Sequence, residues 1–165
     1  MTGNVRLVPV DEGNLEALLS VAVAEADPAE VMPPVAGPPG WSEARREAFR
    51  AFHRQHFGGL TGPTRTVMYT ILVGDDVLGM IRMAWRPEPE TVETGIWLGR
   101  SARGLGLGKA ALRALLAEAA RVGARRVVAE TTAGNLPAMS VLRHCGAELH
   151  TADGDGVRAE IRLPS

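Results

Sequence analysis

A glycine-rich segment with a cation on each side is the part of this sequence best suited to hold a ligand. It runs from Arg100 to Lys109 and reads Arg-Ser-Ala-Arg-Gly-Leu-Gly-Leu-Gly-Lys. Glycine lets a backbone approach a ligand closely and turn its N–H groups toward it. Where such a segment opens a helix, unpaired N–H groups and the positive end of the helix dipole together form an anion site. The sequence therefore predicts a phosphate or pyrophosphate site at this segment.

Two common phosphate-binding patterns do not fit the segment. A P-loop has its first glycine where Arg103 stands and its hydroxyl residue where Ala110 stands. The dinucleotide pattern G-x-G-x-x-G has its third glycine where Lys109 stands. The pattern that does fit is R-x-x-G-x-G, made by Arg103, Gly106 and Gly108.

A second motif lies one predicted helix and one predicted strand further along the chain. Asn135 is followed by Ala138, and Gly146 ends the short helix that this segment predicts. In their order and spacing the two motifs resemble those of the GCN5-related N-acetyltransferase (GNAT) superfamily. The resemblance covers most of the chain, from about residue 5 to residue 163.

The resemblance implies that acetyl-CoA is the co-substrate and that no metal takes part. Its pyrophosphate would lie over the glycine-rich segment, and its thioester arm would pair with the backbone of the strand before that segment. The residues implied for acetyl-CoA are Ile96, Trp97, Leu98, Arg103, Gly104, Leu105, Gly106, Leu107, Gly108, Lys109 and Asn135.

Two glutamates are candidates for the general base that removes a proton from the acceptor amine. Glu130 lies five residues before Asn135, at the spacing that members acting on ribosomal-protein N-termini use for their base. Glu93 lies on the preceding predicted strand, where histone-type members place theirs. A chain of water molecules or an acceptor that is already deprotonated remains the alternative to both.

The general acid is where the sequence departs from many members of the superfamily. Leu142 stands seven residues after Asn135, where those members carry a tyrosine. This departure resembles the ribosomal-protein-acetyltransferase-like branch. Ser140, His144 or water could protonate the leaving thiolate, or it could leave unassisted, whereas Tyr69 is expected to pack in the sheet.

The predicted reaction is direct attack of a primary amine, on a small molecule or a protein N-terminus, on acetyl-CoA. The alternative is a catalytically silent acyl-CoA-binding regulatory domain. Acidic Glu88, Glu90 and Glu93 would attract a cationic acceptor if they line the site.

Three other reactive side chains are expected to be structural. Cys145 is expected to be a small buried apolar residue rather than a nucleophile. His53 and His56 lie three residues apart on a predicted helix, but no further ligands follow them at zinc-like spacing.

The composition limits the class of protein. A chain of 165 residues with 45% hydrophobic residues is enough for one domain, taken as residues 1–165. A net charge of −1 gives no general attraction to nucleic acid or to anionic membranes. One cysteine and no long apolar run favour the cytoplasm, and a homodimer is compatible with the resemblance.

The elements that must position these residues alternate between strand and helix patterns. The predicted fold is α/β, the GNAT fold, with a mostly antiparallel mixed sheet, one splayed parallel strand pair and flanking helices. Strands are predicted at 5–10, 66–73, 77–84, 92–98, 126–131, 147–151 and 157–163. Helices are predicted at 11–24 with Asp11 as cap, at 42–56 and 107–122, and between Asn135 and Gly146.

Overall fold

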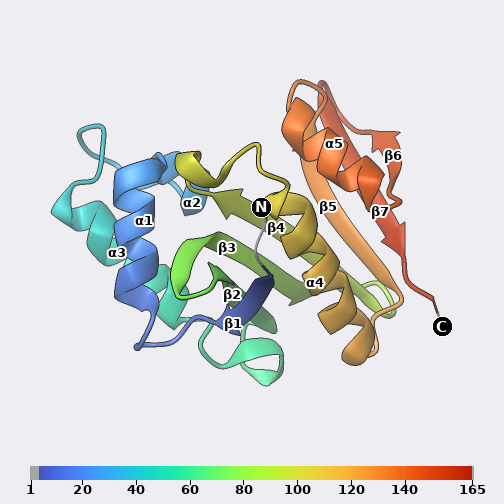
Figure 1. Ribbon diagram of the computed structural model, residues 1–165, viewed down its shortest axis with the longest axis horizontal. Coiled ribbons are helices and arrows are strands. Elements are labelled where there is room, and N and C mark those ends of the chain that lie inside the picture. The colour runs from blue at the N-terminus through green and yellow to red at the C-terminus, as the bar shows by residue number, and fades with distance from the viewer. Residues whose placement is uncertain (1–3, 165) are drawn as a thin grey trace.

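The computed structural model describes residues 4–164 and shows a seven-stranded sheet with helices on both faces (Figure 1). The strand order is β1-β2-β3-β4-β5-β7-β6, and every neighbouring pair is antiparallel except β4 and β5. The strands are β1 Val5–Pro9, β2 Thr66–Val73, β3 Asp76–Trp85, β4 Thr91–Leu98, β5 Arg126–Thr132, β6 Glu148–Thr151 and β7 Gly156–Arg162. The predicted mixed sheet with one parallel pair is therefore confirmed.

The helices follow the predicted order with one addition. They are α1 Leu15–Glu25, α2 Pro28–Val31, α3 Glu43–Arg54, α4 Leu107–Arg121 and α5 Leu136–His144, with 3-10 turns η1 Gly59–Thr61 and η2 Arg100–Ala102. The prediction missed α2, which is a single turn fixed by a capping box between Asp27 and Glu30. It also misplaced the start of α1, because Asn14 rather than Asp11 occupies the N-cap position and the two residues hydrogen-bond to each other.

Two hydrophobic cores lie on opposite faces of the sheet, as the alternation of side chains along β3 shows. Ile81 and Met83 pack with α4, whereas Met80, directly before Ile81, packs with α1 and α3. Successive residues of a strand point to opposite faces, so α4 covers one face while α1 and α3 lie on the other.

The parallel strands β4 and β5 stay together for only three residue pairs. Thr91 pairs with Arg126, and the last pair joins Glu93 to Val128. Beyond it β4 remains paired with β3 as far as Leu98, and β5 remains paired with β7 to its end. Each strand is therefore held by its outer neighbour, and the two diverge toward the first turn of α4, as Figure 1 shows. We call this opening the split.

Candidate active site

The glycine-rich segment forms an open anion site at the start of α4. Gly106 is the N-cap residue, with φ of 79°, and Gly104 has φ of 77°; both angles are left-handed, which favours glycine. Among the residues that the structure describes, no side chain caps this end of the helix. The first backbone donor with a recorded partner is Ala110, which bonds to the Gly106 carbonyl at 3.2 Å. Within the described chain, the N–H groups of residues 107–109 are therefore available to a ligand.

Arg103, the first residue of the motif, is not free in this structure. Its Nε donates to the Leu98 carbonyl at 3.0 Å, and its Nη2 donates to Glu30 Oε2 at 2.9 Å. Glu30 belongs to α2, so the motif arginine links the glycine-rich segment to the single helical turn that follows α1. This contact could not be predicted from the sequence, because 73 positions separate the two residues.

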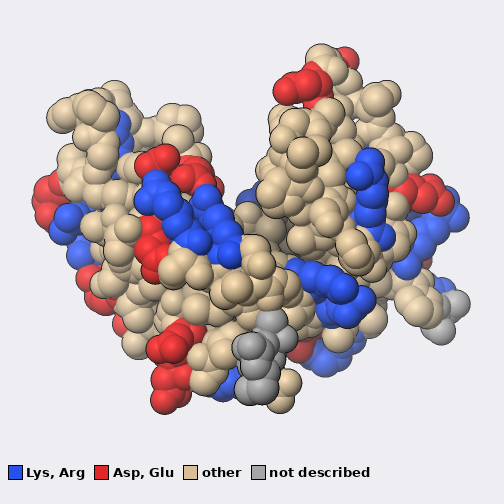
Figure 2. All heavy atoms as spheres, turned by 45° about the horizontal axis from the view of Figure 1, so that its top comes forward, with Lys and Arg blue, Asp and Glu red and all other residues tan. Residues whose placement is uncertain are grey.

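The predicted backbone contacts for the thioester arm lie along the part of β4 that pairs with β3 but no longer with β5. Ile96, Trp97 and Leu98 all follow Glu93, where pairing with β5 ends. The Ile96 side chain is 42% exposed, whereas the Trp97 side chain is only 6% exposed and packs against α1 and α3. Figure 2 shows a deep hollow between the two halves of the molecule, with acidic and basic side chains meeting on its left wall.

Glu93 and Glu130 lie on the same face of the sheet, on either side of the split. Their neighbours Val92 and Ala129 belong to the core under α4, so both glutamates point to the other face. Glu93 is in the last paired position, and Glu130 lies two residues beyond Val128 on β5. The structure thus brings the two predicted bases to the same opening.

The two carboxylates differ sharply in their partners. Glu93 is 26% exposed and accepts from Arg82 Nη2 at 2.5 Å and from Arg86 Nη1 at 3.5 Å. Glu130 is exposed, and no hydrogen bond or ion pair is recorded for its side chain among residues 4–164. Only Glu130 therefore has a carboxylate that is free to accept a proton from an incoming group.

The expected attraction for a cationic acceptor is not supported by the charge pattern. Besides Glu93, Glu88 lies 3.6 Å from Arg86, and Glu90 lies 3.9 Å from Arg125. Each of the three acidic side chains therefore has an arginine beside it, so they present little net negative charge to a ligand.

The second motif forms the start of α5, on the other side of the split. Asn135 is the N-cap residue, and its side-chain oxygen accepts from the Ala138 N–H at 3.2 Å. Leu142 is buried in the core and holds no proton donor. Ser140 and His144 are exposed, and His144 Nδ1 bonds to the Ser140 carbonyl at 2.9 Å.

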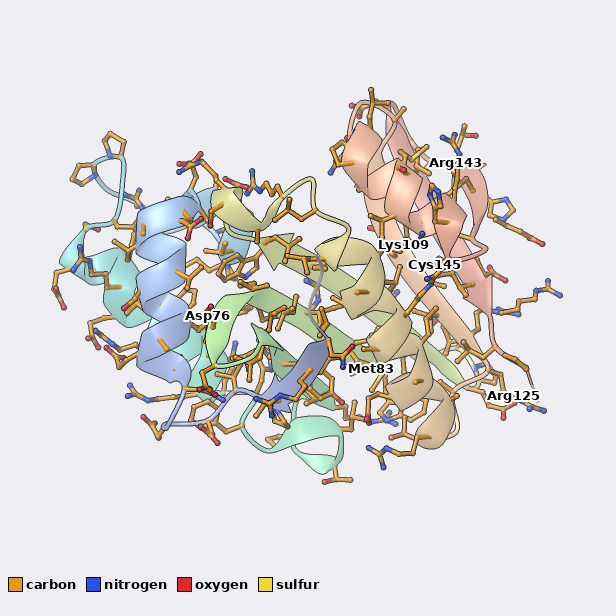
Figure 3. All side chains as sticks on the ribbon, in the orientation of Figure 1. Asp76, Met83, Lys109, Arg125, Arg143 and Cys145 are labelled. Carbon is orange, nitrogen blue, oxygen red and sulfur yellow. The ribbon has the colours of Figure 1, made fainter. Side chains whose placement is uncertain are left out.

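The remaining reactive residues have structural surroundings. Cys145 packs against the core under α4, and burial raises the pKa of its thiol, which disfavours the nucleophilic thiolate. Figure 3 shows it beside Lys109, between α4 and α5. Tyr69 is buried in the sheet, as predicted, and burial raises the pKa of its hydroxyl. No cluster of three metal-ligating side chains occurs in residues 4–164.

His53 and His56 have different environments, because α3 ends at Arg54 and not at residue 56 as predicted, which leaves His56 in the turn that follows. His53 is 1% exposed, and its Nδ1–H donates to the Phe49 carbonyl at 2.8 Å. Burial lowers the pKa of His53 to about 4, so the ring is neutral at physiological pH. His56 Nδ1 lies 2.8 Å from the Thr64 hydroxyl.

A cavity of about 270 Å³ lies on the same face of the sheet as the two glutamates. Its apolar wall includes Met68, Met80 and Phe52, and β4 contributes Ile96 and Trp97. Its charged side chains are Glu30 and Arg82. The cavity was not predicted from the sequence, because its walls come from five separate segments.

Comparison with known families now decides the assignment of the chain. Residues 4–148 match the model of the acetyltransferase (GNAT) domain. The chain belongs to the GNAT family. It is thus an acetyl-CoA-dependent N-acetyltransferase. Among curated proteins, none matches the sequence.

Several solved GNAT structures have the same fold at low sequence identity. RimL, a ribosomal L7/L12 alpha-N-protein acetyltransferase solved with coenzyme A in a cysteine disulfide, is 20% identical with a TM-score of 0.76, over 98% of this chain and 96% of RimL. Mycobacterium smegmatis RimJ, solved with a coenzyme A disulfide, is 22% identical with a TM-score of 0.76, over 97% of this chain and 82% of RimJ.

A more distant neighbour is Campylobacter jejuni PseH, solved with acetyl coenzyme A. It is 10% identical with a TM-score of 0.70, over 97% of this chain and 99% of PseH. The presence of RimL and RimJ among the neighbours agrees with the branch that the sequence resembled. In the part of this GNAT chain that the structure describes, no helix is long and apolar enough to cross a membrane.

Proposed function

We propose that this enzyme transfers an acetyl group from acetyl-CoA, bound in the split, to a primary amine of a small molecule or a protein N-terminus. One observation carries the proposal: pairing of β4 with β5 ends at Glu93, and the strands open toward the uncapped first turn of α4. An extended arm that ends in a diphosphate matches this combination of an open strand edge and an anion site. We also propose that the enzyme works in the cytoplasm.

The residues of this chain fit acetyl-CoA in two ways. The N–H groups of residues 107–109 have no recorded partner within residues 4–164 and lie at a helix start, so they suit the diphosphate. Arg103 would add positive charge beside the diphosphate through its Nη1, for which no acceptor is recorded among residues 4–164, while its bonds to Leu98 and Glu30 stay in place. The backbone of β4 from Ile96 to Leu98 would take the thioester arm as an added strand.

Acetyl-CoA supplies the acetyl group as an activated thioester. The amine nitrogen of the acceptor forms the new bond to the acetyl carbon, and the bond from that carbon to sulfur breaks. Glu130 accepts the proton that the amine nitrogen loses, since its carboxylate is exposed and has no recorded partner. Glu93 is a second candidate, but its ion pairs with Arg82 and Arg86 support a structural role.

The leaving thiolate takes its proton from solvent in this scheme. Leu142 is buried and has no donor, and neither Ser140 nor His144 lines the cavity. A thiolate is a good enough leaving group to depart without an acid near neutral pH. Asn135 caps α5 and, we propose, also contacts the coenzyme arm from the β5 side of the split.

Binding of coenzyme A by calorimetry and release of free thiol from acetyl-CoA with a panel of amines test the proposal. Gly106→Glu places a negative side chain at the anion site and is expected to weaken binding by at least tenfold. Gly123→Glu is the matched control, because Gly123 is also left-handed, with φ of 94°, but follows the other end of α4.

Two results would contradict the proposal. Equal affinity of wild type and Gly106→Glu for coenzyme A would remove the anion site from the account. Coenzyme binding without thiol release for any amine would instead favour the catalytically silent acyl-CoA-binding domain.

A further inference from the structure

We propose that Arg82 selects the acceptor by binding the carbonyl or carboxylate oxygen next to its amine. The acceptor class is then an α-aminoacyl compound, either a free α-amino acid or a peptide N-terminus, rather than a polyamine or an amino sugar. The inference rests on the proposed function, because it takes the acceptor to enter the cavity beside Ile96 and Trp97.

Arg82 lies across the backbone at the mouth of the split. In the sheet it stands opposite Gly95, which directly precedes Ile96 and lies two residues beyond the last β4 position paired with β5. A Cβ atom added to Gly95 would lie only 2.6 Å from the Arg82 Cζ atom. The guanidinium therefore occupies the space that a side chain at position 95 would need. Arg82 can lie there only because residue 95 is a glycine.

Arg82 is the charged residue of the cavity wall that still has N–H donors without a recorded partner. Its Nη2 binds Glu93, but no acceptor is recorded for its Nε or Nη1 among residues 4–164, and its side chain is 39% exposed. Glu30, the other charged residue of the wall, already uses both oxygens, one for the Asp27 N–H at 3.1 Å and one for Arg103. The cavity therefore offers a ligand free N–H donors but no free carboxylate.

The position of these donors matches the chemistry of an α-amino acid unit. An amine that attacks a thioester beside Ile96 lies one residue from Gly95, over which the guanidinium rests. In an α-aminoacyl group, the amine and the carbonyl carbon are bonded to the same carbon atom, so the oxygen follows the amine closely. A guanidinium binds such an oxygen with charge-assisted hydrogen bonds, and a carboxylate with two of them.

The same arrangement disfavours polycationic acceptors. Arg82 places a positive charge in the cavity wall, and the acidic residues at positions 88, 90 and 93 each have an arginine beside them. A volume of about 270 Å³ is near the lower end of ligand pockets, which hold roughly 300–1,000 Å³. It accommodates one compact residue, whose side chain would contact Met68 and Met80.

The test compares four acceptors that differ in the group next to the amine: leucine, the tripeptide leucyl-alanyl-alanine, 3-methylbutylamine and spermidine. Thiol release is measured with wild type, Arg82→Gln, Gly95→Ala and Arg86→Gln. The readout is the ratio of kcat/KM for leucine or the tripeptide to kcat/KM for 3-methylbutylamine, which has the same side chain but no carbonyl. Comparing this ratio between variants cancels the different pKa values of the amines.

Wild type is expected to prefer leucine or the tripeptide, and the better of the two identifies the source of the amine. The ratio is expected to fall by about 10- to 100-fold in Arg82→Gln, because this variant loses the charge-assisted hydrogen bonds. A similar fall is expected in Gly95→Ala, because the added methyl group displaces the guanidinium without removing it. Arg86→Gln is the control, since Arg86 also pairs with Glu93 but does not line the cavity. A wild type that prefers 3-methylbutylamine or spermidine, or a ratio that Arg82→Gln leaves unchanged, overturns the inference.

A binding experiment separates this inference from the proposed function. Calorimetry on protein saturated with coenzyme A compares N-acetylleucine and N-acetyl-leucyl-alanyl-alanine with N-(3-methylbutyl)acetamide, and it requires no turnover. If N-acetylleucine or the N-acetylated tripeptide binds more tightly to wild type than to Arg82→Gln, the role of Arg82 is supported even when no acceptor releases thiol. The lack of thiol release would then contradict only the proposed acetyl transfer. Equal binding of all three compounds to wild type and Arg82→Gln overturns the inference.

Discussion

The two walls of the split differ in how far their polar groups are already engaged. On the β4 wall, Glu93 pairs with Arg82 and Arg86, and Arg103 pairs with Glu30. On the β5 wall, the Glu130 side chain has no recorded partner in the described residues. A glutamate at a family position is therefore not by itself a base, because its existing partners decide whether it can take a proton.

The difference follows from what lies behind each wall. Three acidic side chains near α1 and α2 hold the segment after β4: Glu25 accepts from the Ser101 N–H at 2.6 Å, Asp27 lies 3.2 Å from Arg100, and Glu30 pairs with Arg103. The β5 wall is backed by β7 and by α5, which packs on α4. The β4 wall is thus fixed in place by charges, whereas on the β5 wall the Glu130 carboxylate has no recorded partner among residues 4–164.

The largest effect is expected from Glu130→Gln, which keeps the shape of the side chain but removes its basicity. A general base contributes typically about 10²- to 10⁴-fold, so kcat/KM at neutral pH should fall by that order while the protein stays folded. The loss should shrink as pH rises, because more of the acceptor amine is already neutral. A pH profile of kcat/KM for wild type and variant measures both effects.

Glu93→Gln is the paired test on the opposite wall. Its expected loss in kcat/KM is below about tenfold, because the residue holds Arg82 and Arg86 in place rather than accepting a proton. A large, pH-dependent loss in Glu93→Gln together with normal activity in Glu130→Gln would reverse the two roles. If neither variant shows such a loss, the proton passes to water or the acceptor binds as a free amine.

The cavity side of the molecule also contains a buried group whose titration should change stability rather than catalysis. The pKa of His53 falls from 6.5 to about 4 because the ring is buried, so the unfolded chain takes up its proton first as pH falls. The contribution of neutral His53 to the free energy of unfolding is fully present above about pH 6.5 and is lost as the pH falls from there to about pH 4. The full loss is about 3 kcal/mol, which urea unfolding at a series of pH values measures.

His53→Phe should remove most of this pH dependence, since Phe49 and Phe52 already surround the ring. His150→Phe is the matched control, because His150 is exposed on β6 and its replacement should leave the dependence intact. An unfolding free energy that falls equally in wild type and His53→Phe would show that other groups cause the acid sensitivity.

A smaller effect is expected at Asn135, on the β5 wall. Asn135→Ala loses the bond to the Ala138 N–H and should destabilise the fold by about 1 kcal/mol. Asn135→Ser restores a cap with a shorter side chain, so the free energy of unfolding should return close to that of wild type. The KM for acetyl-CoA should still be several-fold higher than in wild type, because the shorter side chain does not reach the coenzyme arm. A normal KM in Asn135→Ser would mean that Asn135 only caps α5.

The fold was largely predictable because its signals are local. Glycines mark the hairpin at Gly74 and the end of α4 at Gly123, both left-handed in the structure, and the intervening strands and helices have clear periodicity. The separation of β4 from β5 was predicted only from the family resemblance, because no local sequence pattern indicates where two strands separate. The α2 turn was missed because a four-residue helix has no periodicity to detect.

The candidate site was predictable only in its residue types. The sequence identified the glycine-rich segment, both glutamates and Asn135, but it did not reveal that Arg82 and Arg86 pair with Glu93 or that Glu30 pairs with Arg103. These contacts join residues on different elements, and long arginine side chains can reach many partners. The cavity and its spare donors on Arg82 became visible only with the sheet register.

Amide hydrogen exchange with and without coenzyme A tests the central claim, that the coenzyme lies in the split, most directly. The account predicts slower exchange in two places, the β4 backbone after Glu93 and the first turn of α4 at residues 107–109, while the paired residues Thr91 and Val92 stay unchanged. Protection confined to the cavity wall at residues 29–33, or no added protection along β4 although the coenzyme binds, would contradict it.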